Sequence, residues 1–178
     1  MAVNLESHGR EELFEDVDLS RTVGWFTSIH PVALRLPEDE GWSATLRAVK
    51  SQLRAVPDRG VGYGALRHLT GSPGTLPTHD SPRISFNYHG QFAVEGQGKP
   101  ASNLLRQRIE CPGDDHHPDE QRAHLIDVVG AVEEGRLVFT WGYSGELHRT
   151  ETIRSLAEEM NGWLLSLVET CATERREG

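Results

Sequence analysis

The sequence predicts an α/β fold, a sandwich of the α+β type in which a sheet packs against helices. Three observations predict it. Short segments alternate apolar and polar residues as strands do, a strong hairpin pattern occurs late in the chain, and two longer segments carry the one-sided apolar stripe of amphipathic helices. The 178-residue chain has no internal repeat and no domain boundary, so a single domain over residues 1–178 is expected.

The first strand is expected at residues 3–6, where apolar and polar side chains alternate. Residues 22–36 are rich in β-favouring side chains. Pro31 among them lacks the donor of a sheet ladder, so it suits an edge, a bulge or a break between two short strands. Another strand is predicted at residues 84–88, and a hairpin is predicted to turn at residues 133–135. These segments supply the sheet of the sandwich.

Two helices are expected to cover that sheet. Apolar residues recur at spacings of four and three over residues 42–56, acidic residues precede this stretch, and Pro57 ends it. A second helix begins with Thr150 as its cap and carries an apolar stripe as far as Cys171. A short helix at residues 65–69 is expected to follow the glycine-rich turn.

The composition disfavours several classes of partner. The formal net charge of −9 disfavours nucleic-acid binding, which needs a basic face. No segment approaches the roughly 18 apolar residues of a membrane span, and the first residues lack the pattern of a secretory signal. Cys111 and Cys171 form neither a disulfide framework nor a Cys-x-x-Cys pattern. We therefore expect a cytoplasmic protein with no nucleic-acid or membrane partner.

The run Gly60-Val61-Gly62-Tyr63-Gly64 superficially suggests a phosphate-binding loop. A dinucleotide fingerprint must follow a strand and open a helix, with an acidic residue about 20 positions later. Here the run follows a predicted helix, and no acidic residue stands at the required distance. The glycines therefore favour a tight turn with positive φ.

A cluster of acidic residues and histidines suggests a metal site. Adjacent histidines are poorly placed to bind one ion, and the i, i+4 spacing of helical metal ligands is missing. The cluster lies in a polar stretch with proline and glycine, which is typical of a solvated loop. We therefore expect no metal site at this set: Asp114, Asp115, His116, His117, Asp119 and His124.

No nucleophile motif of the Gly-x-Ser-x-Gly type occurs. The remaining candidate for chemistry is Glu6, a carboxylate at the end of a strand that is followed by His8 and Arg10. Glu6 is either a base desolvated in a cleft or an exposed residue near the N-terminus. The residue types alone leave both interpretations open.

Four segments occur in one order along the chain: Glu6–Glu11, Arg21–Ser28, Pro57–Gly64 and Phe86–Gln91. The set resembles the second half of an epimerization domain of nonribosomal peptide synthetases, a branch of the condensation-domain superfamily. The family wording Arg-Thr-Val-Gly-Trp-Phe-Thr stands unchanged in the second segment. Condensing members of the superfamily usually lack Gly-Trp-Phe-Thr, so the resemblance favours epimerization over amide formation.

His30 replaces the tyrosine of the family's Tyr-Pro after the second segment, and two further departures lie inside the motifs. Ser7 replaces the first glycine of Glu-Gly-His-Gly-Arg-Glu, and His89 replaces the leucine of Phe-Asn-Tyr-Leu-Gly. The superfamily also carries a histidine doublet that reads His-His-x-x-x-Asp-Gly. The pair His116-His117 is not that motif, because the required aspartate and glycine do not follow it.

The resemblance implies a domain of two chloramphenicol-acetyltransferase-like lobes around a central channel. This chain is expected to form the C-terminal lobe, a mixed sheet packed against helices, with the N-terminal lobe absent. The doublet histidine belongs to that N-terminal lobe. We therefore expect this polypeptide to be an incomplete enzyme that is inactive alone.

The resemblance also implies the reaction, inversion from L to D at the α-carbon of an aminoacyl or peptidyl thioester. The thioester is carried on the phosphopantetheine arm of a peptidyl carrier protein, and this chain itself is expected to bind no cofactor. The thioester acidifies the α-proton, and inversion needs acid–base groups on both faces of the α-carbon. The implied catalytic residues are Glu6 and Tyr88, and the implied substrate-channel residues are His8, Arg10, Thr27, Ser28 and Asn87.

Two other functions remain open, a noncatalytic module that docks a carrier protein and a fragment of a condensing, amide-forming domain. The expected partners are a peptidyl carrier protein and the missing lobe or a synthetase neighbour. A lone lobe exposes the surface that faces its partner, so we also expect a homodimer or limited solubility.

Overall fold

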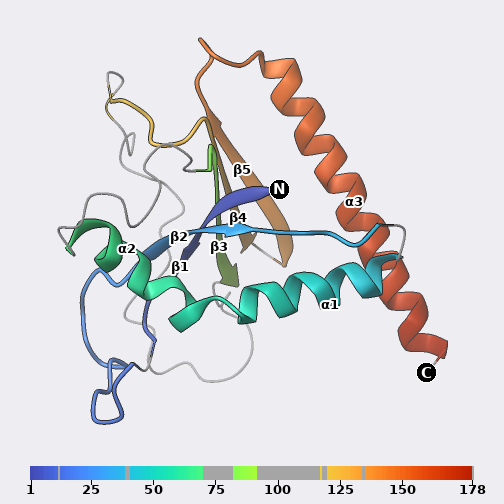
Figure 1. The fold of residues 1–178 in the computed structure, drawn as a ribbon. Coiled ribbons are helices and arrows are strands. Elements are labelled where there is room, and N and C mark those ends of the chain that lie inside the picture. Colours follow the sequence, from blue (N-terminus) through green and yellow to red (C-terminus); the bar gives the residue numbers. More distant parts are fainter. Residues whose placement is uncertain are drawn as a thin grey trace, which may run out of the picture.

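A computed structural model describes the fold of most of the chain (Figure 1). The described residues are 1–11, 13–38, 41–69, 82–91, 117, 120–133 and 135–177. Their elements in chain order are β1 (Ala2–Ser7), β2 (Ser28–Ala33), α1 (Gly41–Arg54), the 3-10 helix η1 (Pro57–Gly60), α2 (Val61–His68), β3 (Ile84–Gln91), β4 (Ile126–Glu133), β5 (Arg136–Tyr143) and α3 (Thr150–Glu177).

The strands form one five-stranded sheet in the order β2-β1-β3-β4-β5. The inner pairs β1–β3 and β3–β4 are parallel, whereas the outer pairs β1–β2 and β4–β5 are antiparallel. The predicted α/β fold with a mixed sheet is therefore confirmed. Pro31 lies opposite Asn4 on the edge strand β2, where a missing ladder donor is tolerated.

The expected helices form, with shifted ends. α1 stops at Arg54, and α3 runs from Thr150 to Glu177, so Thr150 is its first residue rather than the cap before it. The short helix α2 begins at Val61 rather than at residue 65, so two of the three glycines of the run lie inside it. Only Gly60, with φ of 83°, has the positive φ that the sequence predicted for that run. Among the described residues, no helix is long and apolar enough to cross a membrane.

The core lies between the sheet and α3. Ile126 and Val128 of β4 and Ile153 of α3 form a buried cluster, against which Phe86 and Trp141 pack. Alternate residues of β4 point to this side, as the period-two pattern predicted. Burial of such side chains contributes roughly 1.5–3 kcal/mol each, so this cluster fixes the N-terminal half of α3 on the sheet.

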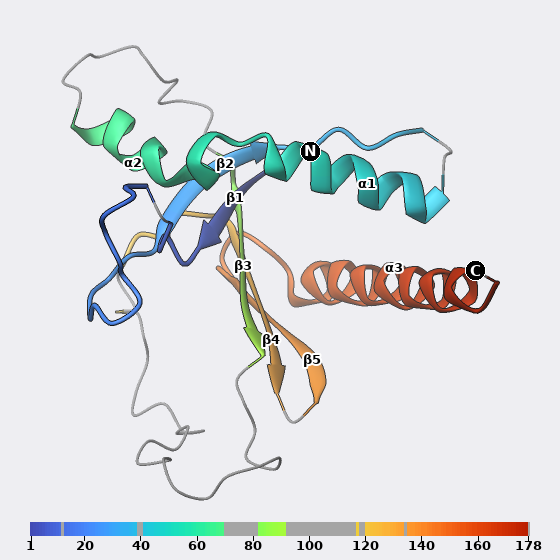
Figure 2. The same cartoon turned by 90° about the horizontal axis from the view of Figure 1, so that it is seen from below.

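α1 contacts α3 at one end (Figure 1). The Trp42 and Trp163 rings meet edge to face with centroids 5.9 Å apart, and the Trp42 indole Nε1 donates to Ser166 Oγ at 3.1 Å. Figure 2 shows α1 and α3 as two separate rods on the same side of the sheet. No residue of α1 is buried, although its apolar stripe faces inward.

η1 and α2 pack against β2, where Gly60 lies over the ring of His30. A Cβ atom on Gly60 would come within 2.1 Å of His30 Nδ1. His30 is 4% exposed, and its Nδ1 has no hydrogen-bond partner among the described residues. Burial lowers the pKa of His30 below its usual value of 6.5. Asp58 and Arg59 also have positive φ, so this turn between α1 and α2 is tight.

Candidate functional site

The sheet has a polar face on the side opposite the buried core. Asn4 and Glu6 of β1 lie in register with Ser85 and Asn87 of β3, and Ser85 lies in register with Asp127 of β4. Residues in register on neighbouring strands point to the same side, and they alternate with the apolar residues that face α3. We call these five residues the polar face.

Glu6 occupies an interior position of this face. It lies between Ile29 of β2 and Asn87 of β3, and its side chain is partly exposed. Asn87 Nδ2 lies 3.1 Å from Nε2 of the exposed His89, two residues further on the same strand. One carboxylate, one amide and one imidazole therefore stand close together on two neighbouring strands.

The adjacent row of the polar face is tied together by side chains. Ser85 Oγ donates to Asp127 Oδ1, and Arg122 Nη2 forms an ion pair with Asp127 Oδ2. His124 Nδ1 lies 3.2 Å from Asp127 Oδ1, and His124 Nε2 lies 2.8 Å from Asn4 Nδ2. This network links β1, β3 and β4 directly beside the Glu6 row.

His124 belongs to the set of acidic residues and histidines at which the sequence predicted no metal site, and in the structure it takes part in this network. His117 of that set is also described, and its other four members lie outside the described residues. Within the described part of the chain, no group of three or more metal-ligating side chains comes together.

Tyr88 points away from the polar face. It lies in register with Gly130, and a Cβ atom on Gly130 would come 3.2 Å from the Tyr88 ring. Because successive residues of a strand alternate sides, Tyr88 lies on the side opposite Glu6 and Asn87. It is 52% exposed near the end of the regular β3–β4 pairing. The structure thus brings together Glu6 and Asn87 but not Glu6 and Tyr88.

Arg10 fixes the loop that follows β1. Its Nη1 donates to the carbonyl oxygens of Leu19 and Thr22 at 2.8 and 2.9 Å, and its guanidinium lies 4.2 Å from the centroid of the Phe26 ring. Gly9, with φ of 62°, passes so close to Phe26 that a Cβ atom would lie 1.6 Å from the Phe26 carbonyl oxygen. Arg10 therefore joins the first two segments of the resemblance.

His8 and Glu11 extend these contacts to the third segment. His8 Nδ1 accepts a hydrogen bond from the Arg10 backbone N–H at 3.0 Å, and its Nε2 lies 3.8 Å from Glu11 Oε1. The Glu11 carboxylate binds Arg59 of η1 at 3.1 Å. His8 is exposed. The three segments that are separated in sequence therefore meet around the end of β1.

Thr27 and Ser28 lie where β2 begins. Ser28 is in register with Ser7, and their Oγ atoms are 2.8 Å apart. Thr27 is partly exposed. Ser7, which replaces the family glycine, thus has a hydrogen-bond partner on β2. His89, which replaces the family leucine, has a hydrogen-bond partner in Asn87.

Two apolar residues of the second segment are almost entirely uncovered. Val23 is 100% exposed and Trp25 is 90% exposed. Trp25 is therefore not a core residue of this chain. Val23 and Trp25 stand two residues apart and leave apolar surface uncovered in this segment.

Sequence reasoning missed the network of Asn4, Ser85 and Asp127. A partial signal was present, because polar residues alternate with apolar ones at Asn4 and Glu6 and again at Ser85 and Asn87, and Asp127 stands between two apolar residues of the predicted hairpin. The register that aligns them is set by pairing between distant strands, which the pattern of one strand does not specify.

A model of the condensation-domain family matches residues 1–177. The chain is 46% identical over 171 residues to chondramide synthase cmdD of Chondromyces crocatus, covering 96% of this chain and 4% of that protein. It is 33% identical over 183 residues to tyrocidine synthase 1 of Brevibacillus parabrevis, covering 99% of this chain and 17% of that protein.

Among solved structures, the chain is similar to the epimerization domain from the third module of tyrocidine synthetase B. The two share 36% sequence identity with a TM-score of 0.78, and the match covers 96% of this chain and 37% of that chain. The chain therefore spans a small part of the synthetases that it matches and less than half of the solved domain.

Proposed function

Because this chain belongs to the condensation-domain family, we propose that it is the part of a nonribosomal peptide synthetase epimerization domain that carries one acid–base group, Glu6. The substrate is an aminoacyl or peptidyl thioester on the phosphopantetheine arm of a carrier protein, and the reaction inverts its α-carbon from L to D. The observation that carries this proposal is the placement of Glu6 beside Asn87 on the polar face.

The chemistry assigns different tasks to the two residues. The Glu6 carboxylate removes the α-proton, or returns one to the α-carbon in the reverse direction. The negative charge that develops on the thioester oxygen needs a hydrogen-bond donor, and the Asn87 amide is suitably placed in the neighbouring strand. Tyr88 lies on the other side of the sheet, so we assign Glu6 and Asn87, rather than Glu6 and Tyr88, to the reacting group.

Inversion needs a second acid–base group on the opposite face of the α-carbon. We assign this group to a complementary lobe that covers the polar face and completes the channel. The exposed Val23 and Trp25 support a partner at this end of the molecule, because they leave apolar surface bare. On this basis the chain alone performs no inversion, and it binds no cofactor of its own.

The similarity to a solved epimerization domain favours epimerization over amide formation. The alternative is a fragment of a condensing domain, and the unchanged Arg21–Thr27 segment weighs against it. A second alternative is a noncatalytic docking module, which would use the same exposed surface without a role for Glu6.

The test is a chimera in which this chain replaces the matched part of the tyrocidine synthetase B epimerization domain. Exchange of the α-hydrogen of a carrier-bound aminoacyl thioester is followed by mass spectrometry in D2O. Glu6→Gln is expected to lower the exchange rate at least about 100-fold. The matched control Glu146→Gln, in the exposed turn before α3, is expected to leave it unchanged.

Each alternative has its own outcome. Undiminished exchange in Glu6→Gln contradicts the assignment of Glu6. Amide formation without exchange favours a condensing domain, and carrier binding without either reaction, unaffected by Glu6→Gln, favours a docking module. Exchange by the isolated chain contradicts the requirement for a complementary lobe.

A further inference from the structure

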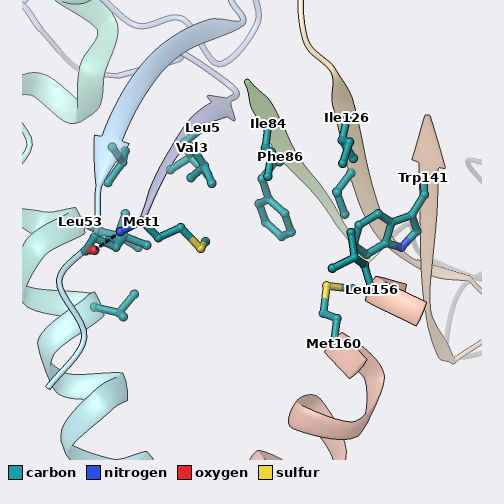
Figure 3. A pocket seen from close by; sticks show the side chains of 14 residues that line it. Met1, Val3, Leu5, Leu53, Ile84, Phe86, Ile126, Trp141, Leu156 and Met160 are labelled. Atoms are coloured by element: carbon teal, nitrogen blue, oxygen red, sulfur yellow. Dashed lines mark hydrogen bonds between the residues drawn. The ribbon is translucent and has the colours of Figure 1, made fainter. Parts of the chain in front are cut away.

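Asn87 and His89 stand two residues apart on β3, on the side of the sheet that carries Glu6. The preceding residue of β3, Phe86, points into the apolar cavity on the core side, and so does Leu5 of β1 (Figure 3). Because successive residues of a strand alternate sides, Glu6 and Asn87 face the other way. The imidazole of His89 therefore borders the two residues to which the proposed chemistry is assigned.

The contact between Asn87 and His89 has a defined direction. Asn87 Nδ2 lies 3.1 Å from His89 Nε2, which is a hydrogen-bond distance. An amide nitrogen carries two hydrogens and accepts none, so Asn87 donates and the His89 ring accepts. A ring that accepts at Nε2 is neutral and carries its hydrogen on Nδ1.

This hydrogen bond fixes the orientation of the Asn87 amide. One Nδ2–H group is directed to His89, and the second Nδ2–H group is left to point elsewhere on the polar face. The terminal torsion of an asparagine is broad and roughly twofold, so an amide that is not held presents its oxygen as well as its nitrogen. A donor that is oriented before the reaction stabilises developing negative charge without the cost of reorienting.

The residue type at position 89 makes this contact a property of this chain. The family wording Phe-Asn-Tyr-Leu-Gly has leucine at this position, and a leucine side chain offers no hydrogen-bond acceptor. His89 supplies an acceptor two positions after the asparagine, on the same strand and the same side. Replacement of His89 by leucine is thus a natural test of the contact.

We propose that His89 is a positioning residue of the epimerization site, whose Nε2 holds the Asn87 amide so that the second Nδ2–H group points to the thioester oxygen. The inference rests on the proposed function, in which Asn87 stabilises that oxygen and Glu6 exchanges the α-proton. His89 acts through Asn87 rather than on the reacting atoms. The hydrogen bond itself can be measured without turnover, so it is testable separately from the chemistry.

The first measurement uses the chain alone. Nuclear magnetic resonance of the isotope-labelled chain is expected to show coupling between Asn87 Nδ2 and His89 Nε2 across the hydrogen bond. The side-chain amide signals of Asn87 are expected to shift in His89→Leu, because the donor loses this acceptor. The matched control His68→Leu changes an exposed histidine at the end of α2 and is expected to leave these signals in place.

The second measurement follows α-hydrogen exchange in the chimera. His89→Leu is expected to lower kcat roughly three- to tenfold and to change KM by less than about twofold, because the oriented donor acts in the transition state. His89→Gln is expected to retain most of the rate, since its amide oxygen also accepts from Nδ2. In an Asn87→Ala background, His89→Leu is expected to lower the rate no further. His68→Leu is expected to leave the rate unchanged.

The outcomes separate this inference from the proposed function. Exchange that depends on Glu6 but is unaffected by His89→Leu, or a rise in KM alone, overturns the role of His89 and leaves the proposed function standing. Equal losses from His89→Leu with and without Asn87→Ala also overturn it, because His89 then acts by another route. Asn87 amide signals that stay in place in His89→Leu overturn the hydrogen bond itself. Absence of exchange in the unchanged chimera contradicts the proposed function, and the inference falls with it.

Discussion

Replacement of Gly60 by alanine is expected to destabilise this fold more than any neighbouring glycine replacement. Gly60 has φ of 83° and stands at the start of α2. An L-residue in the left-handed region costs roughly 1–2 kcal/mol. The new Cβ atom would also lie 2.1 Å from Nδ1 of the buried His30 ring, and such overpacking costs roughly 1–3 kcal/mol.

The two contributions together predict a loss of about 2–5 kcal/mol in the free energy of unfolding. For a chain of this size, each kcal/mol lowers the melting temperature by roughly 2–4 °C, so a decrease of about 4–20 °C is expected. Urea unfolding followed by circular dichroism measures the free energy, and a thermal scan measures the midpoint.

Gly64→Ala is the matched control. Gly64 lies inside α2 and has nothing within 4 Å of the position of a Cβ atom, so alanine is expected to stabilise by up to about 1 kcal/mol. A second control, His30→Ala, removes the ring that the new Cβ meets. In that background, Gly60→Ala is expected to cost about 1–3 kcal/mol less. If Gly60→Ala proves as stable as Gly64→Ala, the packing of η1 on β2 described above is wrong.

The remaining predictions concern pH, the loop after β1 and the strand ends. Burial holds the pKa of His30 below 6.5, so the folded state binds a proton less readily than the unfolded state. The contribution of His30 to the free energy of unfolding is therefore fully present above about pH 6.5. Below that pH the free energy of unfolding falls by up to about 1.4 kcal/mol per pH unit. Urea unfolding at several pH values measures this decrease, and His30→Leu is expected to lack it. Arg10→Met removes both carbonyl contacts and is expected to speed proteolysis within residues 11–26, with Arg35→Met as a control that leaves the rate unchanged. Ser7→Gly removes the hydrogen bond to Ser28 and is expected to cost roughly 0.5–1.5 kcal/mol in urea unfolding, whereas equal stability would show that bond to be dispensable.

Local patterns predicted the elements well. β4 ends at Glu133 and pairs antiparallel with β5, which begins at Arg136, as the hairpin pattern predicted, because a short connection favours antiparallel pairing. The start of α3 was predicted to within one residue, because Thr150, expected as the cap, is the first residue of the helix. The start of α2 was misjudged because Gly62 and Gly64 are poor helix formers, yet packing of this helix on β2 overrides that preference.

The site was harder to predict because it depends on contacts between distant segments. Glu6 and Asn87 meet through parallel pairing of β1 with β3, and nothing in either segment alone specifies that pairing. The family resemblance grouped Glu6 with Tyr88 by motif. Successive side chains of β3 point to opposite faces of the sheet, so Tyr88 and Glu6 lie on different faces. The same alternation could have been used to predict this from the sequence.

The interior position of β1 in the sheet has a consequence for how this chain tolerates change. Hydrogen-bonded neighbours lie on both sides of β1, so an added or deleted residue between Ala2 and Leu5 cannot be absorbed at a free edge. Such an insertion would slide the strand by one position and exchange the carboxylate of Glu6 for the alkyl group of Leu5. Length variation in natural homologues should therefore avoid these residues and collect in the connections between strands.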